Sequence, residues 1–335
     1  MNNDIIPLVK CFVTGFEYKN LLEVINSGNL QGGGKYSQYC EQLLEKELNV
    51  NKVLMTSSCT SALEISSILL SLNYGDEVIV PSFTFVSTAG AFSLHGASPI
   101  FCDIRPDTLN IDENQIEKLI TSKTKAIVVV HYAGTSCEMD KILEIALNYN
   151  LTVIEDNAHG LFGKYKSKYL GTFGDLSTQS FDKQKNFTCG EGGALIINNI
   201  NLTNRAEIIR DKGTNRQSFL RNETKEYTWV DLGSNYYPSD LQSAFLFEQL
   251  KNKDLIQNKR REIFEFYYKN LKSWSKNNDI QLPYIPSYCE SSYHLFHLIM
   301  PSEEISNKFI NYLAKNNISS SKHYLPLNLR VFTHR

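Results

Sequence analysis

Short apolar runs alternate with amphipathic segments through the first two thirds of the chain. The runs have strand length, and the segments between them repeat apolar residues at helical spacing. One run, Ala126–His131, is continuous and β-branched, which is typical of a strand buried on both faces. The pattern therefore predicts an α/β fold in which helices cover both faces of a mostly parallel central sheet. The expected strands are Val53–Met55, Asp76–Pro81, Ser98–Asp103, Ala126–His131, Thr152–Glu155, Leu176–Phe181 and Ala194–Asn198, and the expected helices are Tyr36–Leu48, Ser61–Leu72, Ser87–His95 and Met139–Tyr149.

The pattern changes near residue 240. A long, charged, amphipathic segment begins there and is expected to form one helix that links two domains. We therefore predict a large domain over residues 1–240 and a smaller α+β domain over residues 241–335. The elements expected in this second part are a helix over Ser239–Ser273, a strand over Tyr293–Met300, a helix over Glu303–Lys315 and a strand over Ser319–Tyr324.

Composition narrows the class of protein. The length of 335 residues fits one large and one small domain, and the formal charge of −2 provides no basic field for nucleic acid or acidic membranes. The seven cysteines are scattered without a C-x-x-C pair, which argues against a disulfide framework or structural zinc. Met1–Pro7 lacks signal-peptide features, and no apolar run approaches membrane-spanning length. We expect a cytoplasmic protein with neither nucleic acid nor membrane as a partner.

The segment Ser180–Gly193 carries the strongest chemical signal. It places a lysine after an expected strand and before a glycine-rich turn, and the ends of such strands hold the chemistry of α/β proteins. Another expected strand ends in an acid pair that includes Asp156. A lysine that binds an aldehyde and a carboxylate that holds a pyridine nitrogen protonated are what pyridoxal phosphate requires. Periodicity does not choose between Lys183 and Lys185, one of which is an ordinary surface lysine.

Other segments allow a functional and an ordinary interpretation. Thr56–Ala62 opens a helix and suits a phosphate, although a simple N-cap explains it equally well. Phe85 fits a ring that stacks on a planar cofactor, or a core residue. His159 either contacts the cofactor or is an ordinary buried histidine. A basic cluster fits a diphosphate clamp or a charged surface loop, and it contains Arg210, Lys212, Arg216, Arg221 and Lys225.

Several further patterns resemble binding motifs but do not meet the requirements of those motifs. Gly32–Lys35 resembles a phosphate-binding loop, but Tyr36 stands where serine or threonine is required. No G-x-G-x-x-G follows an expected strand, which disfavours a nicotinamide cofactor. His294 and His297 would point to opposite faces of their expected strand, so no metal site is predicted.

Taken together and in order, these motifs resemble the DegT/DnrJ/EryC1/StrS family of sugar-nucleotide aminotransferases, from Pro7 to about Leu327. The family pattern S-F-x-x-x-K-N-x-x-x-G-E-G-G is matched by Ser180–Gly193. The resemblance selects Lys185 as the lysine that carries pyridoxal phosphate and Asp156 as the acid at its ring nitrogen. It also implies an aspartate-aminotransferase-type structure, that is, the type I fold of pyridoxal phosphate enzymes.

The resemblance implies further cofactor contacts and a dimer. Phe85 would cover the ring, and His159 stands where the family more often has glutamine. The family's S-G-T-x-A-L appears as Ser58–Leu63, with Cys59 in place of the glycine. Asn235 corresponds to an asparagine that reaches the cofactor phosphate of a partner subunit, which implies a homodimer with shared active sites. The remaining cofactor contacts carried over are Ser58, Thr60, Ser61 and Ser180.

Three short segments resemble one subgroup more closely: His131–Gly134, Lys212–Arg216 and Tyr227–Trp229. This subgroup transfers an amino group from glutamate to dTDP-4-dehydro-6-deoxyglucose, giving dTDP-4-amino-4,6-dideoxygalactose for cell-envelope polysaccharides such as O-antigen of lipopolysaccharide and enterobacterial common antigen. Lys212, Arg216 and Tyr324 would then contact the substrate. Amination at the neighbouring 3-keto carbon stays open, as does a passive cofactor-binding protein. A dehydratase of the same fold would carry histidine in place of Lys185.

The end of the chain departs from the family. Relatives continue for several dozen residues beyond the match to His323–Leu327, and they tend to carry histidine where Asn328 stands. We therefore expect a C-terminally truncated chain, a poorly covered small domain with exposed apolar surface near Val331–Phe332, and impaired activity.

Overall fold

A seven-stranded sheet forms the centre of the computed structural model, which describes residues 5–329. The strands lie in the order β1-β9-β8-β5-β4-β2-β3, and only β9 runs antiparallel to its neighbours. The expected mostly parallel sheet is thereby confirmed. The surface expected near Val331–Phe332 lies outside the described residues. The strands are β1 (Lys52–Thr56), β2 (Glu77–Pro81), β3 (Ser98–Cys102), β4 (Thr124–Val130), β5 (Thr152–Asp156), β8 (Leu176–Ser180) and β9 (Gly193–Ile197).

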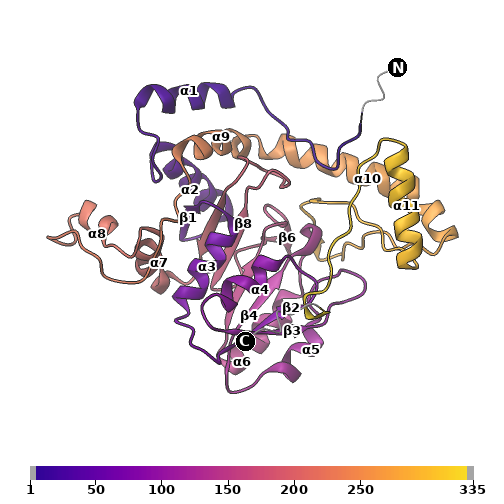
Figure 1. Cartoon of the computed structure of the whole chain (residues 1–335), viewed down its shortest axis with the longest axis horizontal. Coiled ribbons are helices and arrows are strands. Elements are labelled where there is room, and N and C mark those ends of the chain that lie inside the picture. Colours follow the sequence, from indigo (N-terminus) through magenta and orange to yellow (C-terminus); the bar gives the residue numbers. More distant parts are fainter. Residues whose placement is uncertain (1–4, 330–335) are drawn as a thin grey trace.

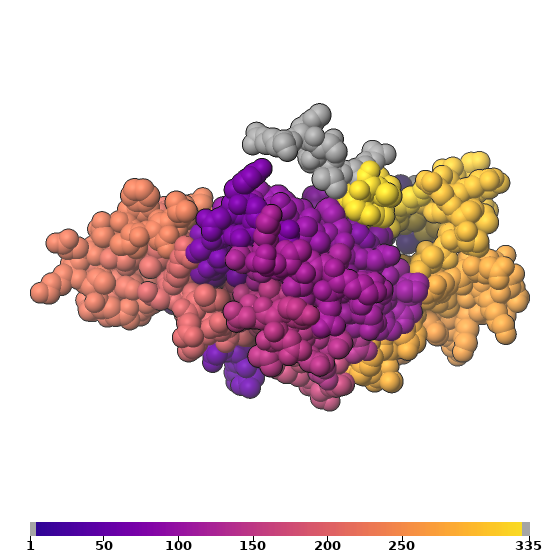
Figure 2. All heavy atoms as spheres, turned by 90° about the horizontal axis from the view of Figure 1, so that it is seen from below, coloured from indigo at the N-terminus to yellow at the C-terminus, as the bar shows by residue number. Residues whose placement is uncertain are grey.

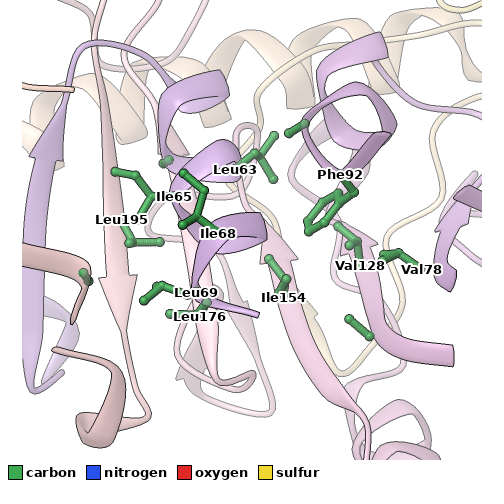
Figure 3. Packing of buried hydrophobic residues seen from close by; sticks show 14 of the residues in the cluster. Leu63, Ile65, Ile68, Leu69, Val78, Phe92, Val128, Ile154, Leu176 and Leu195 are labelled. Atoms are coloured by element: carbon green, nitrogen blue, oxygen red, sulfur yellow. The ribbon is translucent and has the colours of Figure 1, made fainter. Parts of the chain in front are cut away.

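Helices cover both faces of this sheet because alternate strand residues point to opposite sides. On one face, Val128 and Ile154 pack against Leu63 of α3 and Phe92 of α4 (Figure 3). On the other face, Val153 packs in a second cluster with residues of α6. Each such buried side chain contributes about 1.5–3 kcal/mol. The helices are α1 (Glu17–Ser27), α2 (Lys35–Leu48), α3 (Cys59–Leu69), α4 (Val86–Ser93), α5 (Glu113–Ile116), α6 (Met139–Tyr149), α7 (Thr203–Arg210) and α8 (Arg216–Leu220), with 3-10 turns at η1 (Glu117–Leu119), η2 (Tyr132–Gly134), η3 (Ile200–Leu202) and η4 (Leu327–Leu329).

The single helix expected over Ser239–Ser273 is wrong, because two helices occupy this region. They are α9 (Asp240–Lys251) and α10 (Lys253–Asn277). Ser239 and Gln242 form a capping box that starts α9. The break falls at Asn252, where the backbone leaves helical geometry and the side-chain amide donates to the carbonyl of Glu248 at 2.9 Å. An asparagine that binds nearby backbone competes with helix continuation.

The two strands expected near the C-terminus are also wrong. Tyr293–Met300 and Ser319–Tyr324 contain no strand, and the nearest pairings are isolated bridges. The first segment instead docks on the loop after β4, where the His294 N–H donates to the Ala133 carbonyl at 3.3 Å. Tyr293 adopts a left-handed φ of 52°, which interrupts an extended path. A side-chain pattern alone does not reveal that the backbone has no neighbouring strand to pair with.

The remaining C-terminal elements are sparse. A short strand, β10 (Cys289–Glu290), joins β6 (Lys164–Tyr165) and β7 (Lys168–Tyr169) in a second sheet, so this sheet mixes the two parts of the chain. The expected helix over Glu303–Lys315 is present as α11. The domain boundary at residue 240 stays a prediction.

The molecule is elongated, with the sheet in the middle (Figure 1). The segment around α8 projects at one end, and α10 and α11 form the other end (Figure 2). Near the sheet, α9 packs against α1 and α2. Within residues 5–329, no helix is both long and apolar enough to cross a membrane.

Candidate active site

Three of the predicted cofactor residues lie at one edge of the sheet. Asp156 is the last residue of β5, Lys185 lies in the turn after β8, and Ser58 begins α3 directly after β1. These are the carboxyl ends of strands that point the same way, where α/β proteins bind ligands.

The Asp156 carboxylate is buried on the face of the sheet that α4 covers. It accepts a hydrogen bond from the Thr88 hydroxyl at 2.7 Å and another from the Ala158 N–H at 3.2 Å. Burial raises the pKa of Asp156, while the Thr88 hydrogen bond and the nearby Lys185 ammonium oppose the rise. Thr88 was missed in the sequence. The available signal was its place one helical turn after Thr84, whose hydroxyl it contacts at 2.8 Å.

The two candidate lysines differ in their surroundings. Lys183 is exposed, whereas Lys185 is only partly exposed and its ammonium is largely desolvated. Burial lowers the pKa of Lys185, although the negative charges of Asp156 and Asp182 oppose this shift. The turn is fixed by its backbone, in which the Lys185 N–H donates to the Asp182 carbonyl at 2.9 Å. This burial favours Lys185 over Lys183, and its catalytic role stays a prediction.

The N-terminus of α3 offers a cluster of hydroxyl groups. The Ser61 hydroxyl lies 2.9 Å from that of Ser57 and 3.0 Å from that of Ser58, which also caps the helix. Thr60 instead contacts the Ser87 hydroxyl at 2.8 Å. Free N–H groups, hydroxyls and the positive end of the helix dipole fit a phosphate group. Ser57 also belongs to this cluster, although the family resemblance did not include it among the cofactor contacts.

His159 lies buried beside Lys185 and stacks on His294, with the ring centroids 4.2 Å apart. The His159 Nδ1 atom accepts the Ala133 N–H at 3.3 Å, so its proton resides on Nε2. The His294 Nδ1 atom lies 2.9 Å from the Asn186 side-chain oxygen and must therefore carry the proton. Burial holds the pKa of both histidines well below the ordinary value, so both rings are neutral. His294 was missed because it was assigned to a strand.

Three further expected contacts are Phe85, Tyr324 and Ser180. Phe85 is exposed at the start of α4, and its ring centroid is 6.4 Å from that of Tyr324. Tyr324 also packs on Phe83 at 5.5 Å, and burial raises its pKa to about 12. Ser180 ends β8, and its hydroxyl accepts the Asp182 N–H at 3.5 Å. An exposed phenylalanine three residues before Thr88, which binds Asp156, is consistent with a ring left free to cover a ligand.

Three predicted residues lie in the part of the chain between α7 and α9, from which α8 projects (Figure 1). Lys212 and Arg216 both pair with the buried Asp211, at 2.6 Å and 3.6 Å. Asn235 is exposed and forms a backbone bridge with Asp211. Within residues 5–329, no hydrogen bond or ion pair joins any of these three side chains to Lys185 of the same chain.

Residues 13–335 match the sequence profile of the DegT/DnrJ/EryC1/StrS aminotransferase family. The chain belongs to this family. It is 36% identical over 269 residues to GDP-perosamine synthase of Escherichia coli O157:H7, covering 80% of this chain and 72% of that protein. Helicobacter pylori PseC, an aminotransferase involved in the biosynthesis of pseudoaminic acid, superposes with a TM-score of 0.89 at 30% identity, covering 99% of this chain and 89% of PseC.

A second solved structure bears on the cofactor. The PLP-form of the sugar aminotransferase Spr1654 from Streptococcus pneumoniae, described as putative, has a TM-score of 0.88 at 27% identity, over 98% of this chain and 87% of that one. The expected family, type I fold and aminotransferase class are confirmed, and so is pyridoxal phosphate as the cofactor of this family. The roles of single residues stay predictions.

Proposed function

We propose that the chain transfers the amino group of L-glutamate to dTDP-4-keto-6-deoxyglucose, giving dTDP-4-amino-4,6-dideoxygalactose. The observation that carries the aminotransferase chemistry is that a desolvated Lys185 and a buried Asp156 lie at one edge of the sheet, near enough for each charge to influence the pKa of the other. The dTDP sugar is supported by the three subgroup segments in the sequence, of which Lys212–Arg216 lies on the projecting segment.

The residues present fit pyridoxal phosphate. The hydroxyl cluster at the start of α3 matches a phosphate, and the Asp156 carboxylate matches a protonated ring nitrogen. Phe85 is free to lie on the ring. When bound, the cofactor supplies an aldehyde for amines and a ring that accepts electrons.

Lys185 would have two tasks in this scheme. Its amine would hold the cofactor between turnovers, and after glutamate has displaced it, the same amine would move a proton from the α-carbon of glutamate. A lowered pKa serves both tasks, because a larger share of the amine is then unprotonated. Asp156 would remain ionised when a pyridinium nitrogen lies beside it.

A GDP-linked keto sugar is the second candidate acceptor. It is favoured by the 36% identity to a GDP-perosamine synthase. The two acceptors share the sugar chemistry and differ in the nucleotide, so a direct comparison separates them.

The test supplies the protein with pyridoxal phosphate, ¹⁵N-labelled glutamate and a panel of 3-keto and 4-keto sugars linked to dTDP, GDP or UDP. We expect ¹⁵N at carbon 4 of the dTDP sugar, with a kcat/KM at least tenfold above that of the GDP sugar. Preference for the GDP sugar, or label at carbon 3, would replace the proposed acceptor. Absence of 2-oxoglutarate with every acceptor would favour the passive cofactor-binding protein.

A further inference from the structure

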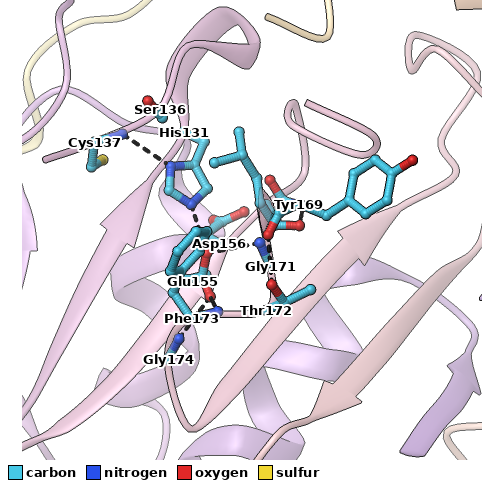
Figure 4. Close-up of polar contacts among 12 residues, drawn as sticks. His131, Ser136, Cys137, Glu155, Asp156, Tyr169, Gly171, Thr172, Phe173 and Gly174 are labelled. Atoms are coloured by element: carbon cyan, nitrogen blue, oxygen red, sulfur yellow. Dashed lines mark hydrogen bonds and ion pairs between the residues drawn. The ribbon is translucent and has the colours of Figure 1, made fainter. Parts of the chain in front are cut away.

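A buried hydrogen-bond network lies behind the cofactor face of the sheet (Figure 4). Glu155 and His131 are both fully buried, and the His131 Nε2 atom lies 2.9 Å from a Glu155 carboxylate oxygen. Glu155 is the neighbour of Asp156 on β5, so the two side chains point to opposite faces. Asp156 faces α4 and its Thr88, whereas Glu155 faces the side that α6 covers.

The Glu155 carboxylate is held from two directions. One oxygen accepts the N–H groups of Phe173 at 2.7 Å and Gly174 at 2.8 Å, and the other accepts the Gly171 N–H at 2.7 Å as well as His131. Burial alone would raise the pKa of Glu155, but His131 and these N–H groups outweigh it and keep the pKa below its ordinary value. Glu155 is therefore a buried anion that accepts four hydrogen bonds.

The hydrogen bonds also fix the proton on His131. The Cys137 N–H donates to Nδ1 at 3.2 Å, so Nδ1 carries no proton and Nε2–H is the donor to Glu155. The His131 backbone N–H donates to the Asp156 carbonyl at 3.3 Å. His131 is thus tied to β5 by both its backbone and its side chain.

The loop that begins at His131 reaches the cofactor side. Two residues on, the Ala133 N–H donates to His159, and the Ala133 carbonyl accepts the His294 N–H. Ala133 has a left-handed φ of 57°, a strained conformation for a non-glycine residue that persists only where its surroundings hold it. A firm anchor at His131 is a physical reason for this loop to keep that shape.

We propose that His131 and Glu155 are positioning residues that hold Asp156 and His159, two of the predicted cofactor contacts, in place from behind the sheet. Neither would touch the cofactor. The inference rests on the proposed roles of Asp156 and His159, and its test uses pyridoxal phosphate without any sugar. An error in the proposed acceptor would therefore leave both readouts unchanged.

The test compares His131→Leu with His131→Gln, because a glutamine amide can place an N–H donor near the position of Nε2. Two quantities are measured: the dissociation constant of pyridoxal phosphate, and the visible circular dichroism of each bound cofactor, which reports how rigidly its surroundings hold it. We expect His131→Leu to raise the dissociation constant at least tenfold and to remove half or more of the dichroism. His131→Gln should stay within threefold of the unaltered protein in both.

Cys137→Ala is the matched control, since it removes a side chain in the same buried region while keeping the N–H that binds His131. It should change neither readout, even where it lowers the melting temperature. If His131→Leu leaves both readouts unchanged, or His131→Gln is as impaired as His131→Leu, the proposal is overturned. Should His131→Leu fail to fold, Glu155→Gln takes its place: weakened binding with reduced dichroism supports the proposal, and unchanged values overturn it.

Discussion

Two residues of the same type in one turn show how environment decides chemistry at the residue scale. Lys183 and Lys185 are separated by one residue, yet only Lys185 is desolvated and close to Asp156. A lysine in water is almost fully protonated at neutral pH and is a poor nucleophile. The burial of Lys185 is a physical reason to expect the cofactor on Lys185, as the family pattern also predicts.

This difference predicts where the cofactor attaches. After incubation with pyridoxal phosphate and reduction with borohydride, the unaltered protein and Lys183→Ala should gain the mass of one reduced cofactor. Lys185→Ala should gain none, because no second desolvated amine is expected at the site. Intact mass spectrometry makes the measurement. Labelling that survives in Lys185→Ala and disappears in Lys183→Ala would assign the attachment to Lys183.

His297 gives a residue-scale prediction about pH. Both ring nitrogens are buried without a hydrogen-bond partner among the described residues, and burial lowers the pKa to about 4 from 6.5. As the pH falls below 6.5, the unfolded chain binds a proton at His297 that the folded chain does not, so stability is lost down to the folded pKa.

Between pH 7.5 and 5.5, His297 alone should therefore remove about 1 kcal/mol of stability. Urea unfolding of the unaltered protein and of His297→Phe at both pH values measures this contribution. The variant should lose about 1 kcal/mol less between the two conditions. Equal losses in both proteins would mean that His297 is already paired or hydrated when folded.

At the element scale, the seven strands of the central sheet and helices α2, α3, α4 and α6 followed from local pattern, whereas the other elements before residue 240 were not predicted. In buried strands such as β4 and amphipathic helices such as α6, the order of apolar and polar residues along the chain shows which positions are buried. The break at Asn252 comes from a local side-chain hydrogen bond to the Glu248 carbonyl, whereas the error at Tyr293–Met300 falls where a distant contact decides. In the latter, the backbone bonds to the loop after β4 and pairs with no strand. An apolar alternation says which side chains are covered, and leaves the backbone partner undetermined.

The contact of β9 with the start of α3 is an element-scale feature that can be tested. A Cβ atom on Gly193 would overlap the backbone of Ser58 and Cys59, so Gly193→Ala must push the hydroxyl cluster away from the sheet. We expect a loss of about 1–3 kcal/mol in stability and at least tenfold weaker binding of pyridoxal phosphate. Chemical unfolding and cofactor titration are the measurements.

Gly90→Ala is the matched control, because a Cβ atom there meets no atom within 4 Å and the residue lies inside α4. It should be neutral or gain up to about 1 kcal/mol from helix propensity. Cofactor binding by Gly193→Ala equal to that of Gly90→Ala would show that the close packing does not support the phosphate site.

At the scale of the whole molecule, the segment around α8, which carries the predicted substrate residues Lys212 and Arg216, projects at one end (Figure 2). We propose that this segment completes the active site of a second copy in a homodimer. Exposed aromatic and aliphatic residues on the same segment support this proposal, since they would be covered by a partner: Tyr227, Trp229, Val230 and Leu232.

A shared site predicts complementation between two inactive variants. Lys185→Ala and Asn235→Ala homodimers should each have little activity, and subunit exchange should restore about a quarter of the unaltered activity. Random exchange makes half of the dimers mixed, and each mixed dimer holds one intact site. Glutamate turnover to 2-oxoglutarate before and after exchange measures the gain. Activity that stays at the mean of the two variants would show that each site is built from one chain.

The sequence by itself determined the α/β class, the seven strands of the central sheet with helices α2, α3, α4 and α6, and the edge of the sheet that carries the chemistry. It could do so because burial patterns and strand ends are local properties of consecutive residues. The tertiary structure decided which lysine is desolvated, that Thr88 and His294 join the site, and that His131 and Glu155 meet behind it. Those facts depend on residues far apart in the chain, whose proximity and shared loss of water arise only when the sheet and its helices are assembled.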